Sequence, residues 1–303
     1  SKDTWVLTEQ AVNTFSLLKH SVGKADLVRG GRNLSSRVVE SLYWFGRYAE
    51  RCDKTSRVLR VALARLIDAG GDAQNALGAV CDLARILQVL PAAEQESGKV
   101  DTTEAPPSRE AELLRAVCGK EWGEGLAGDI RRLLWVATQV RERFSLDNWH
   151  AINRLQHQLQ QYSETLAGED AQPELGEALA FLDQVLLTAS SLAGFAMDNM
   201  TRDDGWRFLI IGRRIERLVF LANAVAGFLR LPSTRAAGSL EWLLELTDSI
   251  ITYRSRYMIQ PQLLPALDLI VFDEGNPHSV AFQLQFLVRY LDNLARLLGG
   301  PRD

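Results

Sequence analysis

The residues whose types and spacing are most suited to chemistry form a six-residue motif, Gly-Arg-x-x-Glu-Arg, at residues 46–51 and again at 212–217. The second copy begins 166 residues after the first (212 − 46). Such a match arises by chance in a chain of this length with a probability of about one in a hundred, which suggests an old duplication. Guanidinium groups pair with carboxylates of the protein or bind carboxylate and phosphate ligands.

The first copy lies on a predicted helix whose polar residues share one face. At about 100° per residue, five side chains fall within an arc of about 100°. They are Glu40, Tyr43, Arg47, Glu50 and Arg51, and apolar residues occupy the opposite side. An amphipathic helix of this kind is typical of a protein surface, so one interpretation is that the charged face is solvated.

The second copy has a different environment. Apolar residues surround it on nearly all sides, and Arg213 and Glu216 lie within one apolar stripe. A helix that is apolar all round is buried, and buried charges must be paired. We therefore predict that the copies pack together through reciprocal ion pairs among Arg47, Glu50, Arg213 and Glu216, and that the motif glycines let the backbones approach. A structural ion-pair lattice and a ligand or catalytic site both remain open.

Three further segments carry candidate polar groups. Segment 199–206 joins two predicted helices and can supply a cap, whereas segment 247–257 places cations near a helix end, where they complement the dipole or hold an anion. In segment 272–279, Asn276 and Pro277 predict the cap and the first turn of the last helix. The full set of candidate ligand-binding or ion-pair residues is Glu40, Tyr43, Arg47, Glu50, Arg51, Arg202, Asp203, Trp206, Arg213, Glu216, Arg217, Tyr253, Arg254 and Asn276.

The composition limits the chemistry. The chain has 303 residues, with 34 Lys and Arg against 38 Asp and Glu, 4 His and 3 Cys. The acidic balance removes the electrostatic case for nucleic-acid binding. Scattered cysteines and dispersed histidines predict no disulfide framework and no metal site. No nucleophile with an activating base stands out, so the catalytic residues, if any, stay unknown.

The start of the chain and its apolar stretches bear on location. No basic and apolar leader is visible, and the absence of an initial methionine suggests a piece of a longer protein. The most apolar long stretch, 178–197, contains several polar residues and predicts a buried helix rather than a membrane span. We expect a reduced, cytoplasmic protein with no membrane partner.

The elements that position these residues are predicted to be helical throughout. Long proline-free stretches rich in Leu, Ala, Arg, Glu and Gln predict an all-α, multi-helix bundle with a long first helix, and period-2 runs typical of strands are missing. A Pro-, Ser- and Thr-rich flexible loop is predicted at 92–107, and it could divide two sub-bundles. The expected helices are Ser35–Ala69, Asp72–Leu90, Ser108–Cys118, Glu124–Phe144, Leu146–Leu166, Glu174–Asn199, Asp203–Leu231, Ser239–Met258, Gln262–Ile270 and Pro277–Leu298.

Four separated stretches resemble the signatures of the bacterial alpha-E family. The stretch 34–51 resembles its opening signature, and 200–217 its central one. Residues 248–257 and 276–284 resemble two later ones, although His278 stands where the family pattern has Arg. The resemblance covers residues 34–298, and it implies a helical domain.

The resemblance also implies partners. Such domains are found beside, or fused to, circularly permuted ATP-grasp ligases, so it implies a role in making or processing peptide-like amides. Residues 1–33 are then a lead-in or linker that begins with the tail of an ATP-grasp-like module. ATP and Mg²⁺ are expected only in that module, and no cofactor is expected in the helical domain.

Three functions compete. The first is a non-catalytic partner domain that binds the ligase and a peptide or amino-acid ligand through its Arg, Glu and Tyr residues. The second is an enzyme acting on amide bonds, with Asp203 or Glu50 as acid and base near Tyr253. The third is a structural bundle that mediates homo-oligomerisation. Convergence of the signature segments on an open pocket favours a ligand site, whereas a dry ion-pair lattice favours a structural role.

Overall fold

The computed structural model describes residues 23, 34–68, 71–92, 108–118, 125–165, 174–235 and 238–298. Every regular element in these ranges is helical, which confirms the all-α prediction. The chain divides into two compact units, Ser1–Asn33 and Leu34–Asp303. The predicted lead-in at 1–33, apart from Gly23, and all but the first residue of the predicted loop at 92–107 lie outside the described residues.

The long first helix is confirmed as α1, Ser36–Ile67, and Ser35 caps it by accepting a hydrogen bond from the backbone N of Val38 at 3.4 Å. The other elements are α2 (Gly71–Ile86), α3 (Arg109–Val117), α4 (Gly125–Gln139), η2 (Arg141–Arg143), α5 (Leu146–Thr165), α6 (Leu175–Asp198), α7 (Asp204–Arg230), η3 (Pro232–Arg235), α8 (Ser239–Leu246), α9 (Ile250–Tyr257), α10 (Leu263–Leu267), η4 (Asp268–Phe272) and α11 (Val280–Leu298).

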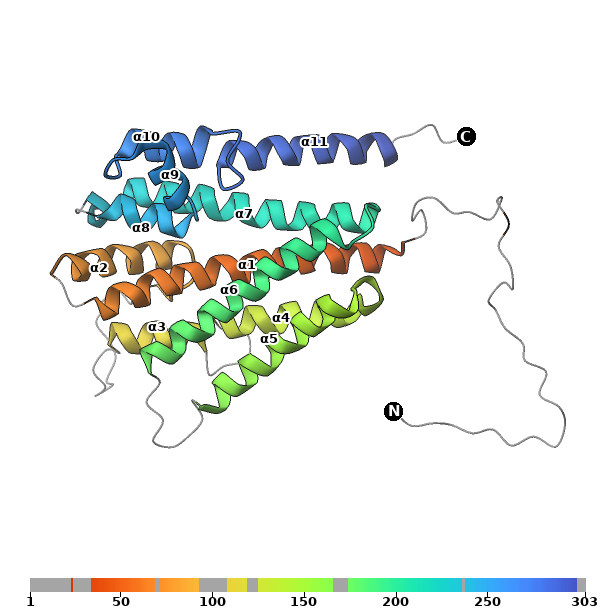
Figure 1. Ribbon diagram of the computed structural model, residues 1–303, viewed down its shortest axis with the longest axis horizontal. Coiled ribbons are helices and arrows are strands. Elements are labelled where there is room, and N and C mark those ends of the chain that lie inside the picture. The colour runs from red at the N-terminus through yellow and green to blue at the C-terminus, as the bar shows by residue number, and fades with distance from the viewer. Residues whose placement is uncertain are drawn as a thin grey trace, which may run out of the picture. The chain divides into compact units, whose positions relative to one another are not determined.

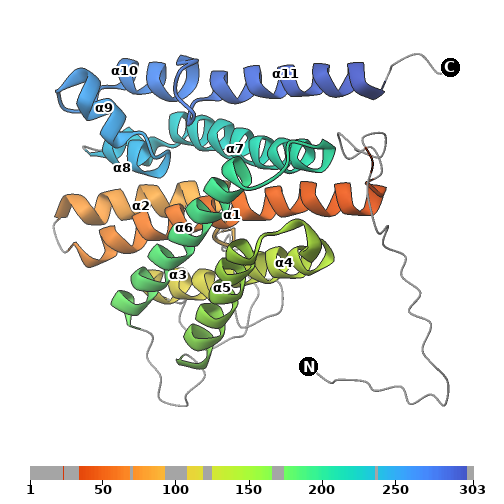
Figure 2. The ribbon, with the colours of Figure 1, turned by 45° about the vertical axis from the view of Figure 1, so that its right-hand side comes forward.

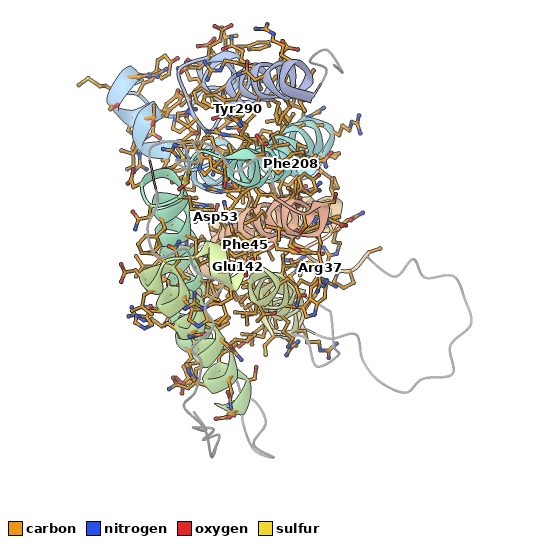
Figure 3. The ribbon with its side chains drawn as sticks, turned by 90° about the vertical axis from the view of Figure 1, so that its right-hand side faces the viewer. Arg37, Phe45, Asp53, Glu142, Phe208 and Tyr290 are labelled. Carbon is orange, nitrogen blue, oxygen red and sulfur yellow. The ribbon has the colours of Figure 1, made fainter. Side chains whose placement is uncertain are left out.

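Helices α1 and α7 form the centre of the bundle and run side by side in the same direction (Figure 1). Helix α11 covers the far side of α7, and α4 lies on the other side of α1 (Figure 2). An end-on view shows this order of layers, with Tyr290 of α11 above Phe208 of α7 and with Phe45 of α1 below them (Figure 3). Helix α6 crosses α1 obliquely, so that α1, α6 and α7 meet near the motif copies.

The predicted helix Ser239–Met258 is wrong, because the structure breaks it into α8 and α9. The break lies at Asp248, whose φ is 57°, a left-handed conformation that Asp tolerates better than most residues. The hydroxyl of Thr247 donates to the carbonyl of Leu243 at 3.0 Å. Hydroxyl and carboxylate side chains close to the backbone compete with helical hydrogen bonds, which is why this polar run ends one helix and begins another.

The predicted start of the last helix at Asn276 and Pro277 is also wrong. Helix α11 begins at Val280, and the Ser279 hydroxyl accepts from the backbone N of Phe282 at 3.0 Å. Asn276 is buried instead: its side chain donates to the carbonyl of Leu269 in η4 and accepts from the backbone N of His278 in the loop. The loop therefore extends three residues further than the proline rule predicts.

Helix α6 is the one described helix that is long and apolar enough to cross a membrane by length and composition. One face of it, including Phe181, Leu182 and Val185, is buried, and α6 packs against α1 and α5. Of its most apolar 18-residue window, 39% is buried, as expected of a helix that packs along one face.

A pocket at the paired Glu-Arg motifs

The two motif glycines allow α1 and α7 to touch backbone to backbone. A Cβ atom on Gly46 would lie 2.1 Å from the carbonyl oxygen of Leu209, and one on Gly212 would lie 2.2 Å from that of Tyr43. Each glycine thus faces the carbonyl three residues before the other glycine. The contact is symmetric, and any larger side chain would force the helices apart.

The charged residues of the motifs pair in the same reciprocal way. Glu50 accepts from Arg217 Nε at 2.5 Å and from Arg213 Nη2 at 3.3 Å. On the other side, Glu216 accepts from Arg51 Nε at 2.7 Å and from Arg47 Nε. The reciprocal pairs expected from the repeated motif are therefore present, and a local two-fold relation connects the two halves.

The two glutamates differ in burial. The side chain of Glu50 is only 1% exposed, so the interpretation of this helix face as solvated is wrong at its centre. Burial by itself raises the pKa of Glu50, but the charges of Arg217, Lys54 and Arg213 outweigh it and hold the pKa well below its usual range. Glu50 is therefore an ionised anchor for three cations.

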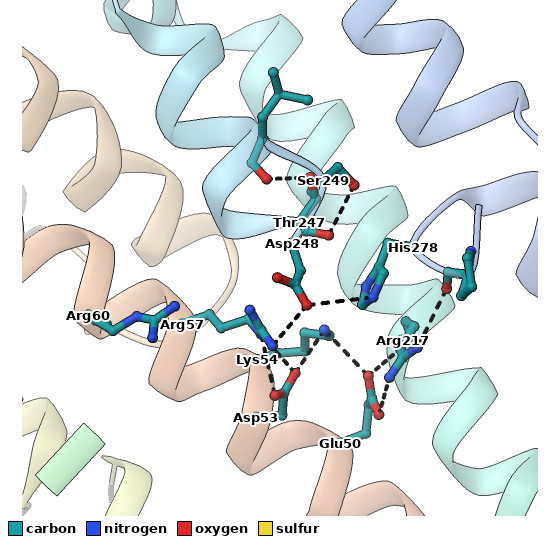
Figure 4. A network of polar contacts seen from close by, with 12 residues as sticks. Glu50, Asp53, Lys54, Arg57, Arg60, Arg217, Thr247, Asp248, Ser249 and His278 are labelled. Atoms are coloured by element: carbon teal, nitrogen blue, oxygen red, sulfur yellow. Dashed lines mark hydrogen bonds and ion pairs between the residues drawn. The ribbon is translucent and has the colours of Figure 1, made fainter. Parts of the chain in front are cut away.

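Around Glu50 the ion pairs extend into a larger network (Figure 4). Lys54 Nζ lies 2.8 Å from Asp53 Oδ2 and 3.5 Å from Glu50 Oε1. Arg57 bridges two carboxylates, with Nε 3.2 Å from Asp53 Oδ2 and Nη2 3.1 Å from Asp248 Oδ2. The break between α8 and α9 therefore brings Asp248 to the motif helices.

The loop before α11 adds His278 to the network around Glu50. His278 Nε2 lies 3.6 Å from Asp248 Oδ2, and the backbone N of His278 donates to Asn276 Oδ1 at 3.0 Å. Asn276 Nδ2 in turn donates to the carbonyl of Leu269 at 2.9 Å. Burial, together with the charges of Arg217 and Lys54, lowers the pKa of His278 to about 3, so the imidazole is neutral at physiological pH.

A pocket of about 280 Å³ adjoins this network. Its polar wall comes from α1, α7, Asp248 and His278, and its apolar wall comes from α6 together with residues of α1 and α7. The lining residues are Phe45, Ala49, Glu50, Asp53, Arg57, Ala189, Ser190, Leu192, Ala193, Leu209, Arg213, Arg217, Asp248 and His278. All four signature segments thus meet at one cavity: both motif copies, the segment that carries Asp248 and the loop that carries His278.

The half around Glu216 has a different character. Arg47 lies over the ring of Trp44 with 5.7 Å from Cζ to the ring centroid, and Arg51 lies over Tyr48 at 5.6 Å. Arg47 Nη1 also donates to the Tyr43 hydroxyl at 2.9 Å. Aromatic faces and a single carboxylate therefore hold these arginines, and none of the five residues lines the pocket.

Three of the remaining candidates, Asp203, Trp206 and Arg202, stabilise local structure. Asp203 caps α7 by accepting from the backbone N of Trp206 at 3.0 Å and also pairs with Arg143. Arg202 stacks on Trp206 and donates to the carbonyl of Ala196 at 3.2 Å, at the end of α6.

The last three candidates lie outside the pocket lining. The hydroxyl of Tyr253 accepts from the backbone N of Gln262 at 2.9 Å, Arg254 pairs with Glu241, and Glu40 is exposed on α1. The acid and base proposed near Tyr253 are therefore engaged elsewhere, with Asp203 at a helix cap and Glu50 in its ion pairs.

The candidate set from the sequence lacks Asp53, Lys54, Arg57, Asp248 and His278, although it draws on the segments that contain the last two. The i, i+4 spacing of Asp53 and Arg57 is a signal that could have found an ion pair on α1. The position of Asp248 depended on an unrecognised helix break. In the part of the chain that the structure describes, no group of three His, Cys, Asp or Glu residues could hold a metal ion.

The fold and the paired motifs define a class of protein, an all-α domain built around Glu-Arg pairs. Residues 34–302 match the sequence profile of Alpha-E, described as a predicted alpha-helical domain with a conserved ER motif. The chain therefore belongs to the Alpha-E family. Glu50-Arg51 and Glu216-Arg217 are Glu-Arg pairs of the kind that this description names, and Glu142-Arg143 is a third.

Curated relatives come from mycobacteria. Uncharacterised proteins of Mycobacterium tuberculosis, strain H37Rv, and of Mycobacterium bovis are each 28% identical over 335 aligned positions. These alignments cover 100% of this chain and 35% of each relative, so the chain spans about a third of the length of the relatives it matches. No solved structure matches the chain.

Proposed function

We propose that this Alpha-E domain is the non-catalytic helical partner of an ATP-grasp amide ligase in the cytoplasm. It docks on the circularly permuted ATP-grasp module, fused or separate, and holds a small amino-acid or peptide ligand for that module. ATP and Mg²⁺ belong to the ligase. The ligase association rests on the family resemblance, and the ligand role rests on the pocket.

The observation that carries the ligand role is the cavity between α1, α6 and α7. Its polar wall is held rigidly, because Glu50 is tied to both Arg217 and Arg213 across the helix contact. Rigid elements place binding groups more accurately than loops do. A concave site with an apolar wall and a few convergent polar groups is the usual form of a small-molecule site.

Support for docking comes from the surface of α9, α10 and η4. Apolar side chains there are strongly exposed, including Ile251, Met258, Leu264 and Phe272. Clustered exposed apolar residues mark interaction sites more often than single ones do. The relatives are about three times as long as the matched region, so in them a domain of this kind is joined to a large additional chain.

The docking proposal is tested by placing a negative charge on this exposed apolar face. Met258→Asp and Leu264→Asp change side chains that are 86% and 80% exposed, so they should leave the fold intact. We expect each to weaken binding to the purified ATP-grasp chain by about tenfold or more, with a matching fall in amine-dependent ATP turnover. Trp135→Asp, on the exposed surface of α4, is the control and should change neither.

Full ligase activity and unchanged affinity in both variants would reject this docking face. Equal ligase activity with and without residues 34–298 would reject the partner role itself. Hydrolysis of peptide amides by the isolated domain would favour the enzyme alternative.

A further inference from the structure

Arg213 is the cation of the pocket with the most unused hydrogen-bonding capacity. Among the described residues its one hydrogen-bond partner is Glu50, at 3.3 Å, although a guanidinium carries five N–H donors. Arg217, by comparison, makes two hydrogen bonds to Glu50 and one to the carbonyl of Pro277. The Arg213 side chain remains 17% exposed while lining the cavity, so its free donors can meet a ligand.

The charged residues that line the cavity balance one another, with Arg57, Arg213 and Arg217 against Glu50, Asp53 and Asp248. Lys54 does not line the cavity, but it pairs with Glu50 and Asp53 and adds one positive charge to the surrounding network. His278 adds no charge at neutral pH, because burial and the nearby cations lower its pKa to about 3. The cavity therefore favours an anionic group.

The opposite wall limits the size and polarity of a ligand. Ala189 and Ala193 lie one turn apart on α6, and Leu192 and Phe45 continue the apolar surface. The volume of about 280 Å³ suits a short carbon skeleton rather than a polymer or a nucleotide. Asp248, whose side chain is 47% exposed, lines the same cavity and offers a carboxylate that solvent can reach.

We propose that the pocket binds a small α-amino acid, with its carboxylate on the free donors of Arg213 and its ammonium group towards Asp248. The short side chain then contacts Ala189, Ala193 and Leu192. Guanidinium and carboxylate groups form paired, charge-assisted hydrogen bonds, which fix the orientation of the ligand. This inference rests on the proposed function, since it names the ligand of the same pocket.

Binding to the complete chain, measured by ligand-detected NMR, tests the ligand class without the ligase. Three probes separate the charged groups: L-alanine carries both, propionate carries only the carboxylate, and ethylamine carries only the amine. We expect L-alanine to bind most tightly, propionate more weakly and ethylamine not at all. Binding of ethylamine as tightly as L-alanine, or no L-alanine binding up to about 50 mM, would overturn the proposal.

Two variants change the pocket by different routes. Arg213→Lys keeps the charge but removes the planar fork, and Ala193→Leu fills the apolar side without touching the ion pairs. Each is expected to weaken L-alanine binding by about tenfold or more. Gly194→Leu is the matched control, because a Cβ on this neighbouring, exposed residue meets nothing within 4 Å. L-alanine affinity unchanged in both pocket variants would overturn the proposal.

The two proposals fail separately. If L-alanine does not bind but Met258→Asp and Leu264→Asp still weaken ligase association, the ligand assignment is wrong and the docking role stands. If L-alanine binds as expected and the ligase neither associates with the chain nor responds to it, the pocket assignment stands and the partner role is wrong.

Discussion

The Glu50 half and the Glu216 half of the helix contact have the same motif and opposite surroundings. Each glutamate receives two arginines of the other helix, and each glycine faces a carbonyl of the other helix. Around Glu50 the network grows to include Lys54, Asp53 and Asp248 and adjoins a cavity. Around Glu216, aromatic rings cover the arginines and the side chain is 12% exposed.

The difference shows that the repeated motif provides the helix contact, while the neighbouring elements decide what each half can do. On the Glu50 side, α6 contributes small residues and the α8–α9 break contributes Asp248. On the Glu216 side, Asp129 of α4 is close enough to Arg51 for their charges to interact. One half is thus built around a pocket, and the other resembles a structural ion pair.

The largest expected effect separates the two glutamates. Glu50→Gln leaves three cations around a buried neutral group and should lower the free energy of unfolding by about 3–5 kcal/mol. Glu216→Gln removes a partly solvated carboxylate and should cost about 1–2 kcal/mol. Urea denaturation of both variants measures the difference. Equal losses would show that the halves are energetically equivalent despite their different burial.

A second comparison tests the symmetry of the backbone contact. Gly46→Ala and Gly212→Ala should each destabilise the protein by about 1–3 kcal/mol, because each new methyl group would collide with a carbonyl of the facing helix. Gly176→Ala on α6, where a Cβ meets nothing within 4 Å, should instead stabilise the protein by about 0.5–1 kcal/mol. Thermal unfolding of the three variants provides the measurement. A harmless Gly46→Ala would contradict the close approach of α1 and α7.

The smallest expected effects concern pH. The pKa of Glu50 is lowered on folding. Its ion pairs therefore stabilise the folded protein fully above the usual carboxylate pKa, and this stabilisation is lost as the pH falls towards the lowered pKa. For Asp129, burial raises the pKa and Arg51 only partly opposes it, so stability is lost as the pH rises through that pKa.

Asp129→Asn should therefore raise the free energy of unfolding at neutral pH. This gain should be smaller than any of the losses predicted above, and it should fade as the pH is lowered. Glu50→Gln should flatten the acid dependence of stability instead. Denaturation midpoints from pH 3 to pH 7 measure both trends. A stability gain for Asp129→Asn that grew on acidification would contradict the assignment of these environments.

The helical class, the long first helix and most helix ranges follow from composition and periodicity, because long Ala-, Leu- and Arg-rich runs between prolines leave little else to form. The reciprocal pairing also followed from the sequence, since charges inside an apolar stripe need partners. These are local properties of a helix and of its buried face.

The pocket itself could not be predicted from periodicity. Asp248 reaches it only because the helix breaks in a left-handed turn, and His278 reaches it only because Asn276 binds the loop instead of capping α11. Both placements depend on tertiary contacts between segments far apart in sequence. Whether the charged face of α1 is solvated or buried could not be decided from the sequence either, because it depends on where α7 packs.

One measurement tests the central claim, that the two halves have diverged into a pocket and a structural pair. It compares the dissociation constant of L-alanine for Arg213→Lys and Arg47→Lys, which change the corresponding arginine of each motif copy. The account predicts a loss of about tenfold or more for Arg213→Lys and wild-type affinity for Arg47→Lys. Equal affinity in the two variants, whether both lose binding or both retain it, would contradict the account.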